Sequence, residues 1–478
     1  MTYQLIPPVN RKPAALGDGP VIPQSVKGKY RTVKWRLLVL CLTIYYVLPF
    51  LRWTRGEGQP DQAILFDLAN VRFYLFWIEA RAQELYYLTG LLVLATIILV
   101  LLNALAGRVW CGFLCPQTIW TDLFLLVERK LEGDRRQQML ALKQPMTLRR
   151  LIRRGVKHVL WLVIATATGG VFVLYFADAP TLLAEFATGD APMIAYGMLA
   201  SLTFTTYAMA GFAREKVCTF MCPWPRLQGA IWDPEALTVT YRKHRGEQRM
   251  SAKKAELARA HGLPAGDCVD CNACVVVCPI GIDIREGPSI ACINCGLCVD
   301  ACDTTMAKVH RPRGLIDFET WTNIERESKG DHRTPARLLR PKIIVISLVG
   351  LVLLAAMSLH LSNRATLSLL VIHDRNPVAV ALSTGEVRNA YELRITNATT
   401  EESRFTLTAS GNAHLQISSP GLGEADAAGL PVIVPADALR KLRVIVTGHP
   451  DLAGDITFHL VRQADGQEAA ATDRFHLP

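Results

Sequence analysis

Five stretches of this 478-residue chain are apolar for about the length that crosses the ~30 Å hydrocarbon core of a bilayer, and they constrain its fold more than any other feature. They cover residues 37–53, 85–106, 159–177, 191–213 and 343–361. In the 22 residues from Leu85 to Ala106, only Thr and Asn interrupt the apolar run. Because the core helices of a large soluble protein seldom lack charge over such a length, we predict five transmembrane helices.

The distribution of Lys and Arg predicts how these helices are oriented. No apolar signal-peptide core is found in residues 1–36, so we expect this tail to stay in the cytoplasm. The connections then assigned to the inside carry 38 Lys and Arg, against 14 outside. This bias obeys the positive-inside rule, so most of the formal net charge of +10 reflects membrane topology, and we expect no nucleic-acid partner.

An odd number of spans places residues 370–478 on the outer side of the membrane. Apolar and polar residues alternate there in runs such as 391–395, 442–446 and 456–460, which are separated by Gly, Pro, Asn and Asp. Such alternation between turn residues is typical of short strands, and about seven can be counted after Pro377. We predict an all-β, immunoglobulin-like sandwich, without the disulfide of antibody domains because this segment has no cysteine.

The cysteines lie almost entirely on the predicted inner side. Of thirteen, only Cys41 falls inside an apolar stretch, where we expect it to pack as a small apolar residue. Eight others form two runs with the spacing of bacterial ferredoxins: Cys268-x2-Cys271-x2-Cys274-x3-Cys278-Pro279 and Cys292-x2-Cys295-x2-Cys298-x3-Cys302. This spacing and a reducing compartment argue against a disulfide framework and against a structural zinc site.

In two-cluster ferredoxins the fourth cysteine of each run ligates the cluster of the other run. We therefore predict a cytoplasmic double [4Fe-4S] domain over residues 263–312, between linkers at 232–262 and 313–342. One cluster is assigned to Cys268, Cys271, Cys274 and Cys302, and the other to Cys292, Cys295, Cys298 and Cys278.

A second repeat lies in the four-helix region, residues 37–231. Cys111-x3-Cys115-Pro116 follows the second apolar stretch, and Cys218-x3-Cys222-Pro223 follows the fourth. Cysteines four residues apart share one face of a helical turn, and a proline disfavours helical backbone at the residue before it. Four such thiols can form a soft-metal site, a further Fe-S centre or a dithiol centre, or they can simply pack the helix ends.

These motifs resemble a known family. The resemblance rests on the two ferredoxin runs and on the segments RVWCGFLCPQTIW (108–120), VCTFMCPWPR (217–226) and ALTVTYRKHRGE (236–247). They are similar to the cytochrome c oxidase accessory proteins called CcoG, FixG or RdxA, over nearly the whole chain. The resemblance implies a bacterial inner-membrane polyferredoxin, with residues 370–478 in the periplasm, that serves assembly of the cbb-type oxidase. It implies a cupric reductase that turns Cu(II) into Cu(I) for copper insertion.

That role makes Cys111, Cys115, Cys218 and Cys222 the candidate catalytic and copper-binding thiols. It implies oxidase assembly factors or copper chaperones as partners, and an electron donor in the cytoplasm. Two other functions stay open: an electron-transfer subunit between quinol and a partner reductase, and a non-catalytic, redox-sensing assembly scaffold. The predicted architecture is a multi-domain membrane protein, with a fifth helix at 343–361 joining the ferredoxin part to the exported sandwich.

Overall fold

The computed structural model describes residues 20–478 apart from 56–58, 82, 83, 85, 338, 364, 365, 400, 412–414, 427, 437 and 451–453. It divides into two compact units, Met1–Met357 and Ser358–Pro478. The first holds all thirteen cysteines, and the second holds a β-sandwich.

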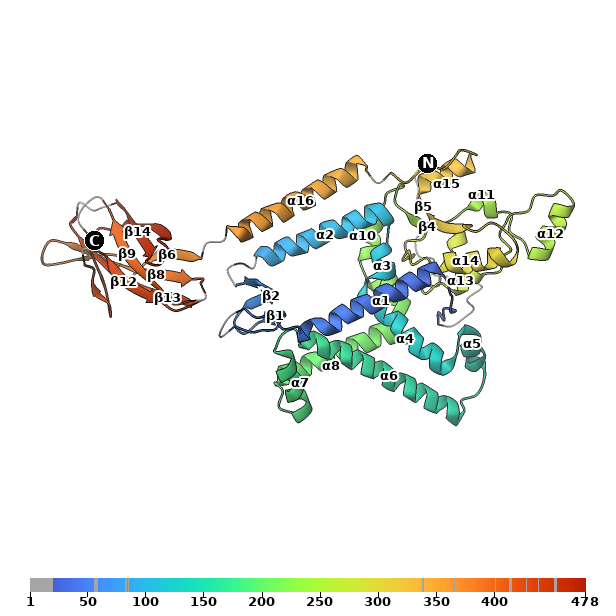
Figure 1. Cartoon of the computed structure of the whole chain (residues 1–478), viewed down its shortest axis with the longest axis horizontal. Coiled ribbons are helices and arrows are strands. Elements are labelled where there is room, and N and C mark those ends of the chain that lie inside the picture. Colours follow the sequence, from blue (N-terminus) through green and yellow to red (C-terminus); the bar gives the residue numbers. More distant parts are fainter. Residues whose placement is uncertain are drawn as a thin grey trace. The chain divides into compact units, whose positions relative to one another are not determined.

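Long apolar helices dominate the first unit (Figure 1). Five of them overlap the predicted stretches: α1 (Lys29–Val47), α2 (Tyr86–Ala106), α6 (Leu148–Val173), α8 (Met193–Ala208) and α16 (Pro341–Ser362). α6 begins well before residue 159, because the Thr147 side chain caps the helix by accepting from the Arg150 backbone N–H and the Arg-rich turns continue it.

Contacts at the helix ends give the directions of these helices. Arg340 at the start of α16 donates to the Ala104 carbonyl near the end of α2 at 2.8 Å, and Gly90 near the start of α2 lies against Met357. α2 and α16 are therefore antiparallel. α6 and α8 are antiparallel as well, since the Tyr207 hydroxyl near the end of α8 lies 3.0 Å from Nδ1 of His158 in the first half of α6.

A sixth segment, Val109–Glu132, is also long and apolar enough to cross a membrane by length and composition. It consists of α3 (Val109–Phe113) and α4 (Pro116–Glu132). Near the start of α4, Gln117 donates to the Met209 carbonyl just beyond α8 at 2.9 Å. At its end, Glu132 pairs with Lys157 of α6 at 2.9 Å. Both ends of α4 thus contact the same end of the bundle, and α4 does not run its length.

Two short strands far apart in the sequence complete the ferredoxin domain. β4 (Thr238–Tyr241) pairs antiparallel with β5 (Ile316–Glu319), and α13 (Ala273–Val276) and α14 (Leu297–Lys308) pack beside them. Both strands lie in segments that the sequence predicts as linkers, because four-residue strands with distant partners leave no local pattern.

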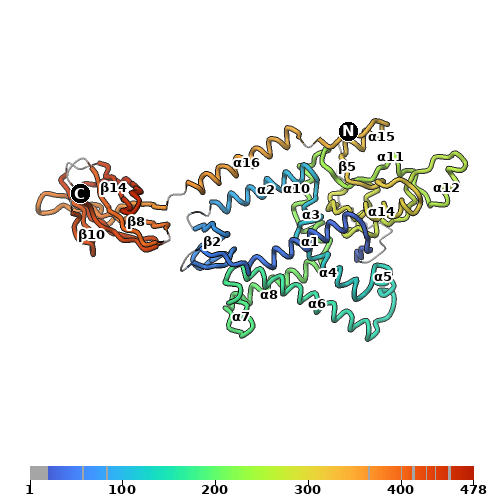
Figure 2. The backbone as a smooth tube through the Cα atoms, viewed as in Figure 1, coloured from blue at the N-terminus to red at the C-terminus, as the bar shows by residue number. Residues whose placement is uncertain are grey.

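The ferredoxin domain packs on the beginning of α1 (Figure 2). The backbone N–H of Arg31 donates to Asp300 of α14 at 2.8 Å, and the rings of Tyr30 and Phe318 lie 4.9 Å apart. We call this end of the bundle the ferredoxin end. The contacts of Arg340 and of both ends of α4 lie at the same end.

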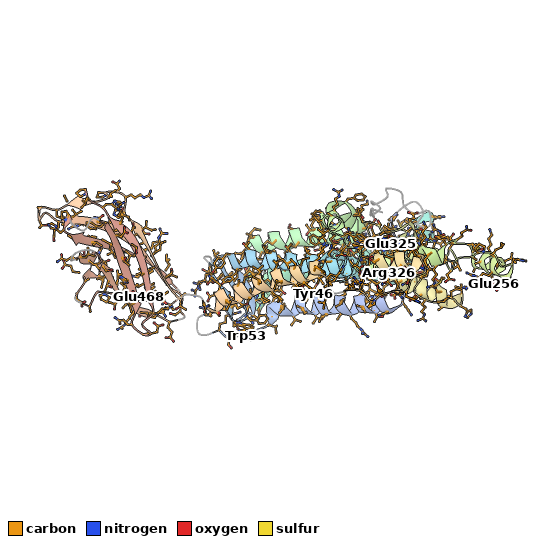
Figure 3. All side chains as sticks on the ribbon, turned by 90° about the horizontal axis from the view of Figure 1, so that it is seen from above. Tyr46, Trp53, Glu256, Glu325, Arg326 and Glu468 are labelled. Atoms are coloured by element: carbon orange, nitrogen blue, oxygen red, sulfur yellow. The ribbon has the colours of Figure 1, made fainter. Side chains whose placement is uncertain are left out.

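Elements absent from our sequence prediction cover the opposite end. A three-stranded antiparallel sheet of β1 (Ile64–Asp67), β2 (Arg72–Leu75) and β3 (Ile78–Ala80) lies there with α7 (Ala179–Thr188). Arg55 holds the sheet by donating to four backbone carbonyls, among them Gln62 and Ala63. Trp53 marks this end, away from Glu325 and Arg326 (Figure 3).

The remaining helices of the first unit are short. They are α5 (Arg135–Lys143), α9 (Arg214–Lys216), α10 (Trp224–Ala230), α11 (Lys243–Gly246), α12 (Ala252–Ala260), α15 (Trp321–Ser328), the 3-10 turns Leu48–Phe50 and Ile284–Glu286, and the π-helical turns Met209–Ala213 and Val217–Met221.

The second unit is a sandwich of two antiparallel sheets. One has the strand order β11-β10-β13-β8-β6, with β7 also paired to β8, and the other has the order β12-β9-β14-β15. The strands are β6 (Leu367–His373), β7 (Val380–Ala381), β8 (Val387–Asn397), β9 (Ser403–Ser410), β10 (Leu415–Ser419), β11 (Gly423–Glu424), β12 (Leu430–Val434), β13 (Ala438–Gly448), β14 (Gly454–Arg462) and β15 (Glu468–Phe475).

The predicted alternation is real in this unit. The three quoted runs lie in β8, β13 and β14, and their inward residues join one core in which Tyr391, Phe405 and Phe458 are fully buried. The count of about seven strands after Pro377 was low. The described residues contain nine there, of which β7 and β11 have only two residues each and are too short to show alternation.

Candidate iron-sulfur and thiol sites

The two ferredoxin runs share one backbone conformation. Asp270 and Asn272 in the first run have φ of 52° and 58°, and Asn294 and Gly296 at the matching places in the second have 52° and 71°. These left-handed residues turn the chain between the cysteines and precede the first turns of α13 and α14. The repeat in the sequence is therefore a repeat in structure.

The cysteines of these runs gather around two separate cavities. Cys274 borders both, as expected for two clusters side by side. One cavity is lined by Cys268, Cys271, Cys274 and Cys302, and the other by Cys278, Cys292, Cys295 and Cys298. Each set contains the three closely spaced cysteines of one run and the fourth cysteine of the other. The crossed ligand assignment stays a prediction, which this grouping supports.

The chemistry of these thiols fits iron-sulfur clusters. All thirteen cysteines lie within the described residues, and none forms a disulfide. Burial raises the pKa of Cys278 to about 11 and the pKa of Cys292 and Cys302 to about 12. A buried thiol with a raised pKa stays protonated until a metal ion displaces the proton. Burial therefore disfavours the free thiolate and leaves the thiolate form to the iron-bound state.

The structure brings the two Cys-x3-Cys-Pro motifs together at the ferredoxin end. Cys115 and Cys222 have extended backbones, with ψ of 128° and 125°, as predicted for residues before proline. Arg108 lies within electrostatic range of Cys111, Cys218 and Cys222, and Cys115 lies in range of Cys111 and Cys218. We call Cys111, Cys115, Cys218 and Cys222 the thiol site. Among the residues described, no three His, Cys, Asp or Glu lie close enough to hold one metal ion.

The thiol site touches the ferredoxin loop that carries Cys292 and Cys295. A Cβ on Gly112 would lie 2.6 Å from the Ile293 carbonyl oxygen and 3.0 Å from Cα of Cys295, so only glycine permits this approach. Cys111 packs in the same apolar cluster as Cys295 and Cys298. The first Cys-x3-Cys-Pro motif therefore adjoins the second ferredoxin cavity.

Arg108 links the thiol site to the ferredoxin loop of Cys292 and Cys295. Only 8% of this residue is exposed, and its guanidinium donates to the Ile290 carbonyl, to the Cys292 carbonyl at 3.3 Å and to the Pro225 carbonyl at 2.5 Å. Ile290 and Cys292 belong to the ferredoxin loop, and Pro225 follows the second Cys-x3-Cys-Pro motif. Arg108 thus links its own segment, the ferredoxin loop and the segment after the second Cys-x3-Cys-Pro motif, where the thiol site adjoins the second ferredoxin cavity.

A buried ion group under the same loop was missed by the sequence analysis. Lys34 of α1 is 2% exposed and lies 2.9 Å from Asp122 of α4, which also accepts from Arg31 at 3.2 Å. Burial raises the pKa of Cys295, and the Lys34 ammonium opposes that rise. The detectable signal was Asp122, a carboxylate inside the otherwise uncharged run 118–127.

Comparison with known proteins identifies the family. Residues 213–321 match the 4Fe-4S dicluster domain, residues 88–132 match a 4Fe-4S binding domain, and residues 357–478 match the IG-like fold at the C-terminal of FixG. The protein RdxA of Cereibacter sphaeroides is 45% identical over 472 residues, covering 96% of this chain and 97% of its own length. The chain belongs to the FixG/RdxA family.

Two further relatives have similar lengths. RdxB of the same organism is 45% identical and covers 89% of this chain and 88% of its own length. The nitrogen fixation protein FixG of Rhizobium meliloti is 42% identical and covers 89% of this chain and 86% of its own length. The predicted family, the ferredoxin-type 4Fe-4S domain and the immunoglobulin-like domain are thereby confirmed, and this FixG/RdxA protein is an iron-sulfur redox protein with several helices apolar enough to span a membrane.

Proposed function

We propose that this FixG/RdxA protein carries electrons to the thiol site and there reduces Cu(II) to Cu(I) for assembly of a cbb-type oxidase in the bacterial inner membrane. Two [4Fe-4S] clusters, held by the eight ferredoxin cysteines, supply one-electron transfer when bound. Each Cu(II) ion accepts one electron and leaves as Cu(I). A cytoplasmic donor must restore that electron.

The observation that carries the proposal is the contact of Gly112 and Arg108 with the loop of Cys292 and Cys295. It gives the electron path a direction. Cys278, Cys292, Cys295 and Cys298 surround the cavity beside the thiol site, so electrons leave from that side. They enter from the side of Cys268, Cys271, Cys274 and Cys302.

Thiols suit copper as a substrate. Copper enters sites of soft sulfur ligands more readily as Cu(I) than as Cu(II), so thiols that receive Cu(II) favour its reduction. Burial raises the pKa of Cys111 to about 12 and that of Cys218 to about 11, and the positive charge of Arg108 opposes both rises. These thiols therefore give up their protons when copper binds. Arg214, four residues before Cys218, is paired with Glu128 at 2.6 Å.

The same proposal includes a membrane topology. Because both ends of α4 contact the ferredoxin end, we propose five crossings, by α1, α2, α6, α8 and α16. The connections at the ferredoxin end carry most of the Lys and Arg, so by the positive-inside rule this end faces the cytoplasm. The sandwich then faces the periplasm. Oxidase assembly factors or copper chaperones are the proposed partners.

The test replaces Cys111, Cys115, Cys218 and Cys222 together by Ser. Anaerobically purified variant should keep about eight irons per chain and lose Cu(II)-dependent reoxidation of its reduced clusters. The matched control is Cys41→Ser, a cysteine in α1 outside both sites, which should reduce Cu(II) like the parent. A quadruple variant that keeps its irons and reduces Cu(II) at the parental rate would show that the thiol site is not the copper site.

A second candidate is a third cluster at the thiol site, in a protein that only relays electrons. The match of residues 88–132, which contain Cys111 and Cys115, to a 4Fe-4S binding domain favours it. The iron count separates the two: about twelve irons in the parent and eight in the quadruple variant indicate a third cluster. Reoxidation by quinone instead of Cu(II) would indicate a quinone-linked electron-transfer subunit, and reoxidation by neither would indicate a redox-sensing scaffold.

A further inference from the structure

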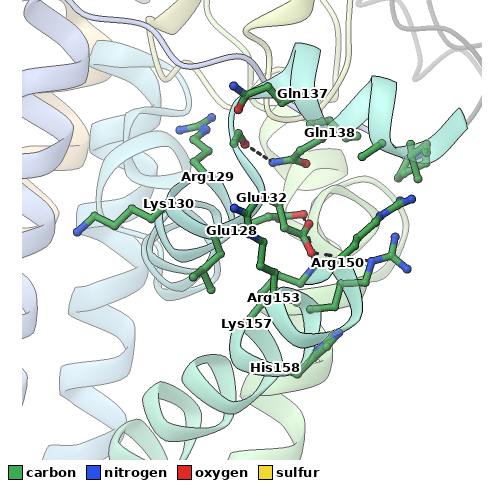
Figure 4. Close-up of a pocket in the computed structure, with 18 of the residues that line it drawn as sticks. Glu128, Arg129, Lys130, Glu132, Gln137, Gln138, Arg150, Arg153, Lys157 and His158 are labelled. Atoms are coloured by element: carbon green, nitrogen blue, oxygen red, sulfur yellow. Dashed lines mark hydrogen bonds and ion pairs between the residues drawn. The ribbon is translucent and has the colours of Figure 1, made fainter. Parts of the chain in front are cut away.

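A large cavity lies at the ferredoxin end, apart from the cysteines (Figure 4). Its volume is about 1040 Å³, and α4, α5, the first turns of α6 and residues 211–216 surround it. Positive charge dominates its lining. Nine Lys or Arg side chains line it, against three Glu: Arg129, Lys130, Arg149, Arg150, Arg153, Arg154, Lys157, Arg214 and Lys216 against Glu128, Glu132 and Glu215.

Only part of this charge is neutralised by the protein. Glu128 pairs with Arg214 at 2.6 Å, and Glu132 pairs with Lys157 at 2.9 Å. Arg150 donates to the Gln144 carbonyl at 3.0 Å. Within the described part of the chain, neither Arg150 nor the other basic residues of this rim, Lys130, Arg149, Arg153 and Lys216, contact a carboxylate. Converging cations without counterions attract an anion.

The floor of the cavity is built and buried. Trp161 is 2% exposed, donates from Nε1 to the Phe124 carbonyl at 3.1 Å, and carries the Lys157 ammonium 5.0 Å above its ring. His158 accepts or donates a hydrogen bond with Tyr207 at 3.0 Å. The cavity is therefore a fixed recess in the helices rather than a gap between mobile surface side chains.

Exposed apolar side chains lie on the same turns of α6 as these arginines, outside the lining of the recess. Leu148, Leu151 and Ile152 are 73%, 57% and 58% exposed. Leu142 at the end of α5 lines the cavity and is 49% exposed. A soluble phosphate compound would contact only the cations of the recess. A phospholipid would also cover the exposed apolar surface of α6, because its phosphate needs cations and its acyl chains need apolar surface nearby.

We propose that this cavity binds the headgroup of an anionic phospholipid, whose acyl chains lie along the apolar face of α6. Arg150 and Arg153 contact the phosphate, a group that guanidinium binds with two parallel hydrogen bonds. The N-terminal tail is a poor occupant, because residues 1–19 contain Arg11 and Lys12 but a single acidic residue, Asp18. The site is independent of the redox proposal.

The experiment uses the full chain in detergent with its clusters loaded. Phosphatidylglycerol and phosphatidylcholine are titrated in turn, and binding is followed by native mass spectrometry. We expect phosphatidylglycerol to bind at least tenfold more tightly. The double variant Arg150→Gln/Arg153→Gln should lose about tenfold in that affinity. The charge-matched control Lys253→Gln/Lys254→Gln, at exposed residues of α12, should bind as the parent does.

Two arms decide the identity of the ligand. Equal binding of the two lipids by the parent protein would overturn the proposal without any variant. Inorganic phosphate at millimolar concentration should not displace phosphatidylglycerol, and displacement would assign the cavity to a soluble anion instead. Unaltered lipid affinity in the arginine double variant would also overturn it, and the iron content of each variant verifies that the protein is folded.

Discussion

Replacing Arg108 by Gln should loosen the ferredoxin loop from the helices. The guanidinium makes two close bonds, to the Ile290 and Pro225 carbonyls, and a longer one of 3.3 Å to Cys292. A hydrogen bond from a charged donor contributes about 1.5–3 kcal/mol, so the two close bonds amount to about 3–6 kcal/mol. Gln recovers one bond at most and removes a costly buried charge. We therefore expect a net loss of about 3 kcal/mol, which is roughly a hundredfold in the docking equilibrium of the loop.

Hydrogen-deuterium exchange measures that change directly. Peptides covering residues 288–296 should exchange faster in Arg108→Gln, and Cu(II)-dependent reoxidation should slow while the iron count stays at the parental value. Arg245→Gln is the matched control, because Arg245 also donates to two backbone carbonyls, those of Pro312 and Arg313, away from the thiol site. Faster exchange is expected there near residues 312–313 and near Asp267, to which Arg245 also donates at 2.7 Å, with residues 288–296 unchanged. Parental protection of residues 288–296 in Arg108→Gln would refute the reasoning.

Three other predictions test the site and the topology. Cys302→Ser should disturb the cluster assigned to the first ferredoxin run, seen as a changed electron paramagnetic resonance signal with about half of the iron lost; loss confined to the other cluster would contradict the crossed ligands. Reporter fusions at Lys329 and Gly385 should report opposite sides of the membrane, and equal readings would remove one crossing. Burial raises the pKa of Glu319, but hydrogen bonds from Asn323, Arg333 and the Thr320 N–H outweigh it and hold that pKa below its usual 4.5. The ionised Glu319 therefore stabilises the fold fully above pH 4.5, and this stabilisation is lost as the pH falls through the folded-state pKa, which lies below 4.5. Glu319→Gln should cost about 3 kcal/mol at pH 7 in urea unfolding, with the difference shrinking as the pH falls below 4.5.

Local patterns in the sequence predicted the parts of the protein that local forces determine. Cysteine spacing located both ferredoxin runs, and apolar length located the helices. Contacts between distant residues left no such pattern: Arg108 and Ile290 are 182 positions apart. The pairing of β4 with β5 and the position of α4 at one end of the bundle were missed for the same reason. For α4, composition alone does not decide, because a helix that packs an apolar face against its neighbours resembles a membrane-spanning helix in composition.

The two Cys-x3-Cys-Pro motifs are alike in sequence and unequal in their surroundings. Each follows a helix that returns to the ferredoxin end, and in each the proline begins a new helical turn, so the four thiols meet only after both hairpins have folded. Cys111 packs against residues of the second ferredoxin cavity, whereas Cys222 is the one exposed cysteine of the four. In the proposed function, Cys111 is therefore placed to receive electrons, and the exposed Cys222 to meet the copper ion. In this proposal, a site formed between two hairpins lets the metal ion and the electron approach from different sides, and both reach the same four thiols.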